Sequence, residues 1–441
     1  MRSKLIAVLL AAPALLAAQQ PATVDTTFKQ ISLADALRLA HDNNVSNITA
    51  DNAIRTANNS VRSAKAQWLP TLSASAGQSI QQGSKLGERN SLIQIPSRWA
   101  YNTGLSSQLT VWDGGKTRAD VHNQEANVAS AQANEVNTEF NVSLQVKQAY
   151  NAVLAAKESE AAARAQLATA QLQLQTSIAK VNAGAANVSD SLQSVVQVGN
   201  AQLQILTAQN SFRTQSATLT RLVGTPYFVT AQLTDTVEHM GAPIDSAQVM
   251  ALGAQGPTIR SADAAVSAAT AARRSAKSAY QPTVSLSGSF GGNGTNAFYG
   301  IPGLKGDNGY PYSKSLQLNA SFPIFNRFQR ENQVANSQIT LDNAQAQARD
   351  ARLAAQQNVV TGIANLRNAE ATMAVQSNNV AAATEALRVV TQRYNLGAST
   401  LLEVTTAQQN LVNAQQQLIQ ARLNYRNAKA QIEAAIGRDL P

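Results

Sequence analysis

The sequence contains no cysteine, few aromatic residues and no long apolar run beyond its first residues. With no cysteine among 441 residues, disulfides, thiolate metal sites and lipid attachment to a thiol are excluded. No later segment holds eighteen consecutive apolar residues, so the sequence predicts no transmembrane helix. A membrane role would therefore have to use β-strands.

Residues that commonly carry chemistry are also scarce. The three histidines, His41, His122 and His239, are widely separated and form no metal-binding motif. The glycines between residues 291 and 309 lack the Lys-Ser/Thr pair of a phosphate-binding loop. The sequence therefore predicts no enzyme, no cofactor and no metal site.

Positive charge is present but dispersed. The formal net charge is +9, yet lysine and arginine form no block, and aromatic residues make up only 5% of the chain. A nucleic-acid-binding protein would concentrate its positive charge and place aromatic residues within it. We therefore predict no nucleic-acid partner.

The first residues resemble a secretory signal peptide in composition. Arg2 and Lys4 precede an apolar stretch from Leu5 to Leu16, and small residues follow it before Gln19. This stretch is too short to span a bilayer. We predict a signal peptide at residues 1–18, with cleavage near Ala18.

The rest of the chain repeats itself at an offset of 212 or 213 residues. Three pairs of segments show the match: Pro70-Thr71 with Pro282-Thr283, Val111-Trp112-Asp113 with Ile324-Phe325-Asn326, and Asn182-Ala183-Gly184 with Asn395-Leu396-Gly397. Such a long period is typical of a duplicated domain, because solenoid repeats are much shorter. The predicted domains are a first repeat at 19–224, a connector at 225–243 and a second repeat at 244–441.

Each repeat is expected to contain strands, a long helix and a returning helix. The predicted ranges are 70–112, 114–181 and 188–222 in the first repeat, and 282–325, 327–396 and 400–436 in the second. Pro70, Trp112, Pro282 and Phe325 mark the expected junctions between strands and helices. The turn-rich segments 81–97 and 291–312 are predicted to be exposed loops.

The expected strands have one apolar and one polar face. In the first repeat, for example, Leu72, Ala74 and Ala76 alternate with serines, and the second repeat follows the same pattern. Amphipathic strands of about ten residues suit a membrane β-barrel with lipid outside and water inside. A half-buried soluble hairpin would give the same alternation.

The expected helices are far longer than those of a globular domain. About 65 residues without proline correspond to a rod of roughly 100 Å, which needs coiled-coil packing to be stable. The returning helix of the second repeat has two rows of seven-residue spacing: Val404, Leu411, Leu418, Tyr425 and Ile432, and Ala407, Ala414, Ala421, Ala428 and Ala435. Large residues facing small ones predict close helix pairing.

These features predict a mainly α-helical protein with a membrane β-barrel. Four strands cannot stand alone in lipid, because the open edges would leave backbone groups unpaired, so the barrel must close between subunits. The helix pairs, whose outer faces are polar, should likewise close side by side into a tube. The expected result is a hollow conduit.

The order of elements resembles the TolC-like outer-membrane efflux family over nearly the whole mature chain. The resemblance rests on the duplication, on the strand exits at Trp112 and Phe325, and on the glycine turns at Gly184 and Gly397. It implies a homotrimer with a twelve-stranded barrel on a twelve-helix tunnel, placed in the outer membrane with a long periplasmic portion.

The resemblance also implies the function and the partners. The protein would be the passive channel component of a tripartite efflux or type I secretion system. Its partners would be outer-membrane lipid, a periplasmic adaptor protein and an inner-membrane pump of the RND, ABC or MFS type. The alternative is a secreted or surface trimeric coiled-coil stalk or adhesin, which accounts poorly for four amphipathic strands.

In the family, the two helical turns form a constricted periplasmic tip. The resemblance places adaptor docking at the turns, here Asn182, Gly184, Asn395 and Gly397. It places the constriction at Glu403, Tyr394 and Asp190, while Ser399 and Thr406 stand where the family has a linking arginine and a second acidic residue. We therefore expect a weak gate with one ring of carboxylates, latched by a hydrogen bond from Tyr394 to Asp190. The alternative for Glu403 and Asp190 is a favourable charge at a helix N-terminus.

Overall fold

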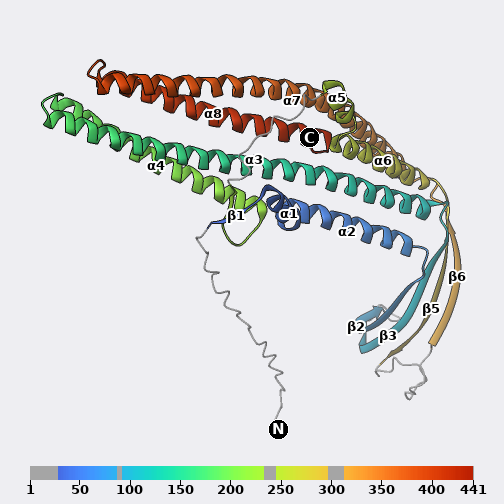
Figure 1. Ribbon diagram of the computed structural model, residues 1–441. Helices are drawn as coiled ribbons and strands as arrows, with labels where there is room; N and C mark the ends of the chain where they lie inside the picture. The colour runs from blue at the N-terminus through green and yellow to red at the C-terminus, as the bar shows by residue number, and fades with distance from the viewer. Residues whose placement is uncertain (1–27, 87–91, 233–244, 296–311, 441) are drawn as a thin grey trace, which may run out of the picture.

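The molecule is a long helical bundle with a β-sheet at one end (Figure 1). This computed structural model describes residues 28–86, 92–232, 245–295 and 312–440. The expected signal peptide and most of the expected connector lie outside these ranges. The boundaries of the two repeats stay a prediction.

Each half of the chain contributes two strands to the four-stranded sheet and two long helices to the bundle. The first half contains β1 Lys29–Ile31, α1 Leu33–Asn43, α2 Val45–Ala66, β2 Thr71–Leu86, β3 Leu92–Trp112, α3 Lys116–Asn182, α4 Val188–Val223 and β4 Val229–Ala231. The second half contains α5 Ser246–Gly253, α6 Pro257–Ser278, β5 Thr283–Thr295, β6 Tyr312–Ser321, α7 Gln329–Asn395 and α8 Leu401–Ile436. Both α3 and α7 have 67 residues, or about 100 Å of helix.

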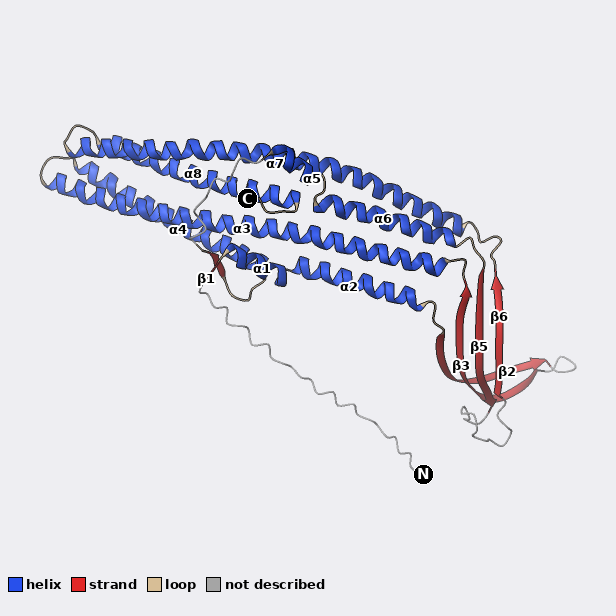
Figure 2. Ribbon diagram, turned by 45° about the vertical axis from the view of Figure 1, so that its right-hand side comes forward, coloured by secondary structure: helices blue, strands red, loops and turns tan. Residues whose placement is uncertain are grey.

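The helices lie side by side in a fixed order. In the part of the bundle far from the sheet, α4 packs on α3, α3 on α8 and α8 on α7; nearer the sheet, α2, α3, α6 and α7 are neighbours (Figure 2). Within the described residues, no helix is both long enough and apolar enough to cross a membrane.

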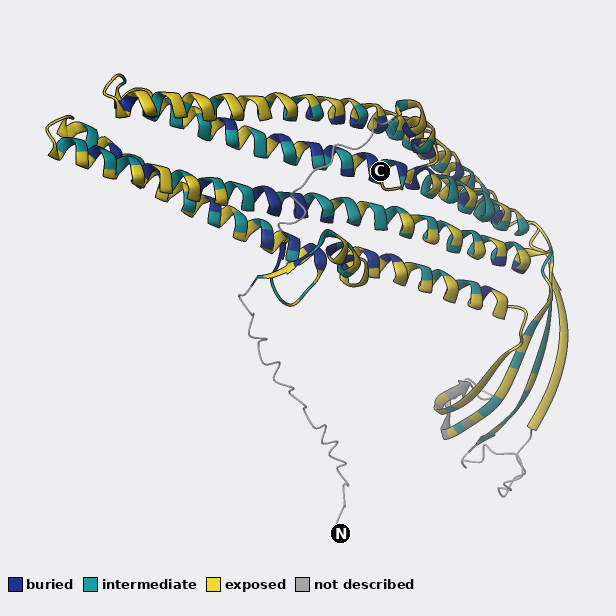
Figure 3. Ribbon diagram, in the orientation of Figure 1, coloured by how far each residue is buried: buried dark blue, intermediate teal, exposed yellow. Residues whose placement is uncertain are grey.

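Burial follows the seven-residue rows that the sequence predicts. The buried residues of α8 include Val404, Tyr425 and Ile432 of the large row and Ala414, Ala421 and Ala428 of the small row. Half-buried and exposed residues make up the rest of the helix surface, so full burial is confined to narrow stripes between neighbours (Figure 3). The predicted rows thus coincide with the buried stripe of this helix at six positions, while Leu411, Leu418, Ala407 and Ala435 are half-buried.

The sheet is antiparallel, with the order β2-β3-β5-β6. Its central pair, β3 and β5, joins the two halves of the chain, while β2 and β6 each have one open edge. The first hairpin is longer than predicted, because β2 continues to Leu86 and β3 begins at Leu92. The prediction of a loop at 81–97 is therefore wrong at both ends. The start of the loop predicted at 291–312 is also wrong, because β5 runs to Thr295. Backbone pairing continues through these polar residues, with one irregularity between Gln81 and Gly83.

The last strand, by contrast, is shorter than predicted. β6 ends at Ser321, whereas the sequence predicted strand structure to residue 325. Pro323 explains the difference, because proline has no backbone N–H to donate to a ladder. Phe325 therefore lies in the connection between β6 and α7 and not in a strand.

A small parallel sheet at mid-length was not predicted. β1 pairs with β4, which lies in the expected connector, and the two strands cover α3 near Tyr150. The hydroxyl of Tyr150 donates to the carbonyl of Ile31 at 3.1 Å and accepts from the amide of Gln232 at 3.1 Å. Lys157 donates to the carbonyl of Ala231 at 2.7 Å. Through these contacts, β1 and β4, which lie near the two ends of the first half, are fixed to α3.

Gly362 of α7 lies in close contact with α8. A Cβ atom there would lie 2.9 Å from Cγ1 of Ile432 on α8. We predict that Gly362→Leu lowers the free energy of unfolding by about 1–3 kcal/mol, because a leucine would have to displace Ile432. Asn358→Leu, at an exposed position one turn earlier, is the control. Thermal unfolding of the purified protein would test this, and equal stability of the two variants would contradict it.

Candidate functional site

The two helical turns lie together at the end of the bundle opposite the sheet (Figure 2). Both have a glycine with positive φ, Gly184 at 70° and Gly397 at 76°. In both turns the amide after the glycine donates back across the turn at 2.8 Å, from Ala185 to the carbonyl of Lys180 and from Ala398 to that of Arg393. This Schellman arrangement needs a left-handed residue, which glycine adopts without cost from a Cβ. Asn182 and Asn395 are the last residues of α3 and α7.

Glu403 is part of the N-terminal cap of α8. Its carboxylate accepts a hydrogen bond from the hydroxyl of Ser399 at 2.6 Å and one from the amide of Thr400 at 3.4 Å. Its own amide donates to the side chain of Thr400 at 3.3 Å, which completes a capping box. The Ser399 hydroxyl first, and then the Thr400 groups, hold the pKa of Glu403 below its ordinary value. This geometry supports the alternative of a helix N-terminal charge for Glu403.

Two other predicted site residues, Thr406 and Asp190, lie near the starts of α8 and α4. The hydroxyl of Thr406 donates to the carbonyl of Leu402 in its own helix at 2.8 Å. Asp190 lies in the first turn of α4, where a negative charge favours the helix dipole.

Tyr394 is buried, and its predicted bond to Asp190 is not formed within the chain. The ring packs with Leu401 and Val404, and the hydroxyl has no hydrogen-bond partner among the described residues. The prediction of a latch from Tyr394 to Asp190 is therefore wrong for the single subunit.

Lys180 makes the contact with Tyr394 instead. Its ammonium lies 3.6 Å from the centroid of the Tyr394 ring and donates to the carbonyl of the same residue at 2.6 Å. Burial lowers the pKa of Lys180. Since Lys180 lies in the last turn of α3 and Tyr394 in the last turn of α7, this pair joins the tips of the two hairpins. Sequence reasoning missed Lys180, whose one signal was its place in the last turn of a helix that ends at the tip.

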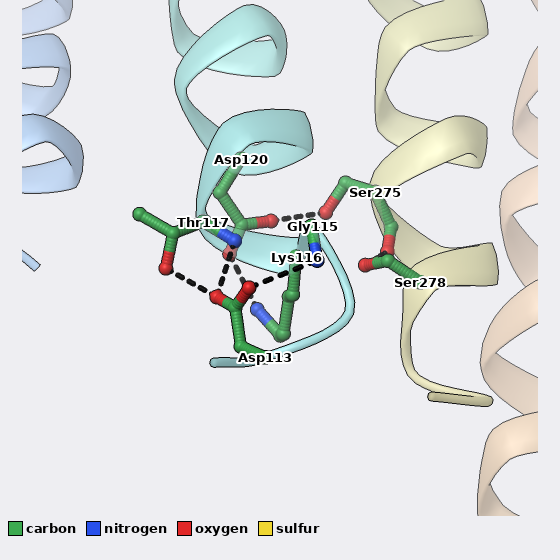
Figure 4. A network of polar contacts seen from close by, with 7 residues as sticks. All are labelled: Asp113, Gly115, Lys116, Thr117, Asp120, Ser275 and Ser278. Carbon is green, nitrogen blue, oxygen red and sulfur yellow. Dashed lines mark hydrogen bonds and ion pairs between the residues drawn. The ribbon is translucent and has the colours of Figure 1, made fainter. Parts of the chain in front are cut away.

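At the other end of the bundle, a polar network fixes the junction between β3 and α3 (Figure 4). The carboxylate of Asp113 accepts from the amide of Gly115 at 3.0 Å and from the amide of Thr117 at 2.7 Å. Burial alone would raise the pKa of Asp113, but these hydrogen bonds and that from the Thr117 hydroxyl hold it below its ordinary value. Asp120 then contacts Lys116 and, on α6, Ser275. The contact between Asp120 and Ser275 therefore joins the start of α3 to α6 of the second half.

The predicted junction residues lie at the ends of strands or between strands and helices. Pro70 and Pro282 stand directly before β2 and β5, and Trp112 is the last residue of β3. Phe325 lies between β6 and α7. Across the described ranges, no group of three or more His, Asp or Glu side chains is placed to hold a metal ion.

Two helices about 100 Å long, each preceded by amphipathic strands and followed by a glycine turn and a returning helix, are the arrangement expected of a periplasm-spanning outer-membrane channel. A family model described as "Outer membrane efflux protein" matches residues 36–225 and 251–438. The chain belongs to the outer membrane efflux protein family. The predicted family and the predicted outer-membrane location are thereby confirmed.

Known proteins with similar sequences or folds support this assignment. The outer membrane efflux protein BepC of Brucella suis is 25% identical over 408 residues, which cover 92% of this chain and 85% of BepC. The fold is similar to that of the outer membrane protein VceC of Vibrio cholerae, with a TM-score of 0.72 at 19% identity, covering 93% of this chain and 97% of VceC. It is also similar to the Campylobacter jejuni CmeC outer membrane channel, with a TM-score of 0.74 at 17% identity, covering 92% of this chain and 85% of CmeC.

The capping box at the tip gives a testable dependence on pH. Because the pKa of Glu403 is lowered in the folded chain, its carboxylate stabilises α8 fully above the ordinary glutamate value of 4.5, and the effect is lost as the pH falls through the lowered value. We predict that acidification loosens the first turn of α8, and that Glu403→Gln removes this dependence.

Hydrogen exchange of peptides covering residues 399–406, measured by mass spectrometry against pH, would test this prediction. Thr400→Ala should raise exchange at every pH, since loss of an N-cap threonine costs about 1 kcal/mol. Identical pH profiles for wild type and Glu403→Gln would show that the carboxylate does not stabilise the turn.

Proposed function

We propose that this chain is the outer-membrane channel component of a tripartite efflux or type I secretion system, a passive conduit from the periplasm to the exterior. The observation that carries the proposal is the pairing of two 67-residue helices with returning helices, joined to one sheet whose two edges are open. Such a subunit is one sector of a tube and does not enclose a space by itself.

The open edges of the helical part support closure by copies of the same chain. α4 and α2 form one edge and α7 the other, and both edges expose apolar side chains. These are Leu192, Val196, Leu203 and Leu206 on α4, Val45 and Ile48 on α2, and Ile339, Leu353, Val360, Val375 and Val389 on α7. Because the two edges differ, each would contact the opposite edge of a neighbour, and such head-to-tail contacts generate a ring when the rotation between subunits closes.

The edges of the sheet would likewise have to be closed by neighbouring subunits. β2 and β6 lie at its edges, and an unpaired edge in lipid leaves backbone N–H and C=O groups without partners. In a homotrimer the edges would pair into a twelve-stranded barrel, continuous with a tunnel of twelve helices. The number three comes from the family and not from these contacts.

Partners follow from the proposed role. Relatives such as BepC are described as outer membrane efflux proteins, so we propose that a periplasmic adaptor docks at the turns containing Asn182, Gly184, Asn395 and Gly397. An inner-membrane pump of the RND, ABC or MFS type would supply the energy. Among the described residues the chain itself presents polar helix faces rather than a catalytic constellation, so transport through it would be passive.

The contact between Lys180 and Tyr394 suggests how the tip is held. The two helices of each hairpin share a packed seam, and this pair links the last turn of α3 to the last turn of α7. We propose that the Lys180 ammonium, and not the Tyr394 hydroxyl, latches the two hairpins, while Glu403 contributes the ring of negative charge that favours cations. A cation over a partly dehydrated ring contributes about 0.5–2 kcal/mol.

Single-channel recording in planar bilayers would test the conduit and the latch together. We predict discrete channels for the full chain, with an open probability raised roughly tenfold by Lys180→Met, because the loss of about 1.4 kcal/mol shifts an equilibrium tenfold. Tyr394→Phe keeps the ring and should leave opening nearly unchanged. The opposite order of effects would assign the latch to the hydroxyl, and a folded oligomer without channels would overturn the proposed function.

Ring closure makes a separate prediction. Leu203→Arg places a charge on the α4 edge, where Leu203 is 62% exposed in the single subunit, and should prevent oligomerisation because the charge would be buried between subunits. Gln204→Arg, an exposed neighbour that points away from that edge, is the matched control. Size-exclusion chromatography with light scattering would measure the oligomer, and an intact oligomer for Leu203→Arg would exclude this edge from the interface.

A further inference from the structure

A polar pocket of about 340 Å³ lies between α7 and α8, near the middle of α7. Its floor includes Ala369, Ala421 and Ala428, which are buried and too small to fill the space between the two helices. Side chains that end in a carboxamide surround this floor: Asn365, Asn368, Asn424, Asn427 and Gln431. Among the described residues that line the space, none has a charged or aromatic side chain. It is called the carboxamide pocket here.

The carboxamides of the pocket have unused hydrogen-bonding groups. The side-chain oxygen of Asn424 accepts a hydrogen bond from the preceding turn of α8 at 2.9 Å, and that of Asn427 accepts one from Asn151 of α3 at 3.2 Å. Within the described ranges, their amide nitrogens donate to no partner, and the side chains of Asn365 and Gln431 form no hydrogen bond. Since each free carboxamide offers two donors and an acceptor, the pocket suits a ligand that both donates and accepts.

The first half of the chain lacks these carboxamides, although α3 pairs with α4 as α7 pairs with α8. At the offset of 213 residues, the positions that correspond to Asn365, Asn424 and Gln431 hold small or hydroxyl-bearing residues. They are Ala152, Ser211 and Thr218. The same helix pairing is therefore made without carboxamides in the first half, so packing alone does not explain them in the second.

The pocket opens away from the edges at which neighbouring subunits would meet. α8 contacts α3 on one side and α7 on the other, and Asn424 and Gln431 are exposed on its free face. Asn365 is about 200° around the helix from Arg367, which donates to Ser246 of α5 at 2.6 Å. The pocket therefore faces away from α5. Because an open tunnel leaves no room for α5 inside it, the pocket would face the tunnel of the proposed ring.

The polar face of the sheet has the same uncharged character. Ser73, Ser106, Ser289 and Ser315 form one row across all four strands, and two pairs of these hydroxyl groups are 2.8 Å apart. The next row is also uncharged and consists of Thr71, Gln108, Ser287 and Gln317. With the apolar face of the sheet toward lipid, these rows would line the conduit. A molecule that leaves the pocket would thus meet hydroxyl and amide groups again.

We propose that the carboxamide pocket binds uncharged, hydroxyl-rich molecules, namely saccharides, as they pass through the tunnel. A sugar hydroxyl both donates and accepts, so neighbouring hydroxyls can pair with the nitrogen and the oxygen of one carboxamide. An ionic ligand would lose water in the pocket without meeting an opposite charge. Binding is weak, because a site inside a conduit has to release its ligand. The proposal rests on the proposed function, which supplies the tunnel.

Ligand-observed saturation-transfer NMR with maltose, a neutral disaccharide, tests the pocket. The oligomer is kept in a detergent without a sugar headgroup, because such a headgroup would compete. We expect a Kd of about 1 mM for the wild type, and a Kd raised roughly tenfold or more by the triple substitution Asn365→Ala, Asn424→Ser and Gln431→Thr. This variant carries the residues of the first half and should fold normally. Asn378→Ala, at an exposed position of α7 outside the pocket, should bind maltose as the wild type does.

Two further probes test the chemical class of the ligand. Glucuronate carries a charge, and N-acetylglycinamide has amide groups but no hydroxyl. We expect neither to displace maltose at equal concentration. Displacement by either one would overturn the assignment to uncharged, hydroxyl-rich molecules, and equal binding of maltose by the wild type and the triple variant would overturn the site itself.

Single-channel recording separates the two sources of saccharide that a periplasm-spanning protein can meet, which are cargo inside the tunnel and cell-wall glycan outside it. Maltose added on the side of the tip should interrupt the current through wild-type channels, and should do so less often in the triple variant. Binding of maltose with no effect on the current would overturn contact with cargo and assign the pocket to the glycan. Working channels without maltose binding would overturn the pocket alone, whereas a folded oligomer that forms no channels would overturn the proposed function.

Discussion

Every other feature of this molecule depends on the close pairing of each long helix with the helix that returns beside it. A helix of 67 residues has too little intrinsic stability in water to remain a straight rod without packing. The seams supply that packing, because alanines such as Ala201 and Ala421 are buried and let the axes approach. The long helices then hold the glycine turns and the sheet about 100 Å apart. The tip, which is held together by few contacts, is therefore far from the sheet, which is suited to lipid.

The helices and their seams could be predicted from the sequence because a seven-residue period is local and recurs many times. Strand ends were less predictable. The backbone hydrogen bonds between strands continue through polar residues such as Gln81, whereas Pro323 ends the pairing of β6. The alternation of apolar and polar residues indicates neither of these effects. The pair of Lys180 and Tyr394 was missed because the residues are 214 positions apart and a cation over a ring leaves no periodic trace. Three-residue strands such as β1 are too short to show alternation.

The two halves share their elements but not their junctions. Asp113 anchors the start of α3 with hydrogen bonds to two amides, whereas the side-chain oxygen of the corresponding residue, Asn326, is buried without a partner. One junction thus satisfies its polar groups internally, while the other leaves an acceptor unsatisfied, holds Arg327 and Phe328 in the left-handed region and exposes aromatic rings.

The parallel pairing of β1 with β4 has a consequence for how the polypeptide acquires its shape during export. Residues 29–31 can pair with residues 229–231 only when the whole intervening segment has emerged, so the contact closes a very long loop and forms late in that half. In the described part of the chain, the buried cluster that packs on β1 and β4, including Tyr150, consists of residues of the first half. The N-terminal half can therefore complete its own core before its C-terminal counterpart has been translocated, and assembly with other subunits can wait until both halves are folded.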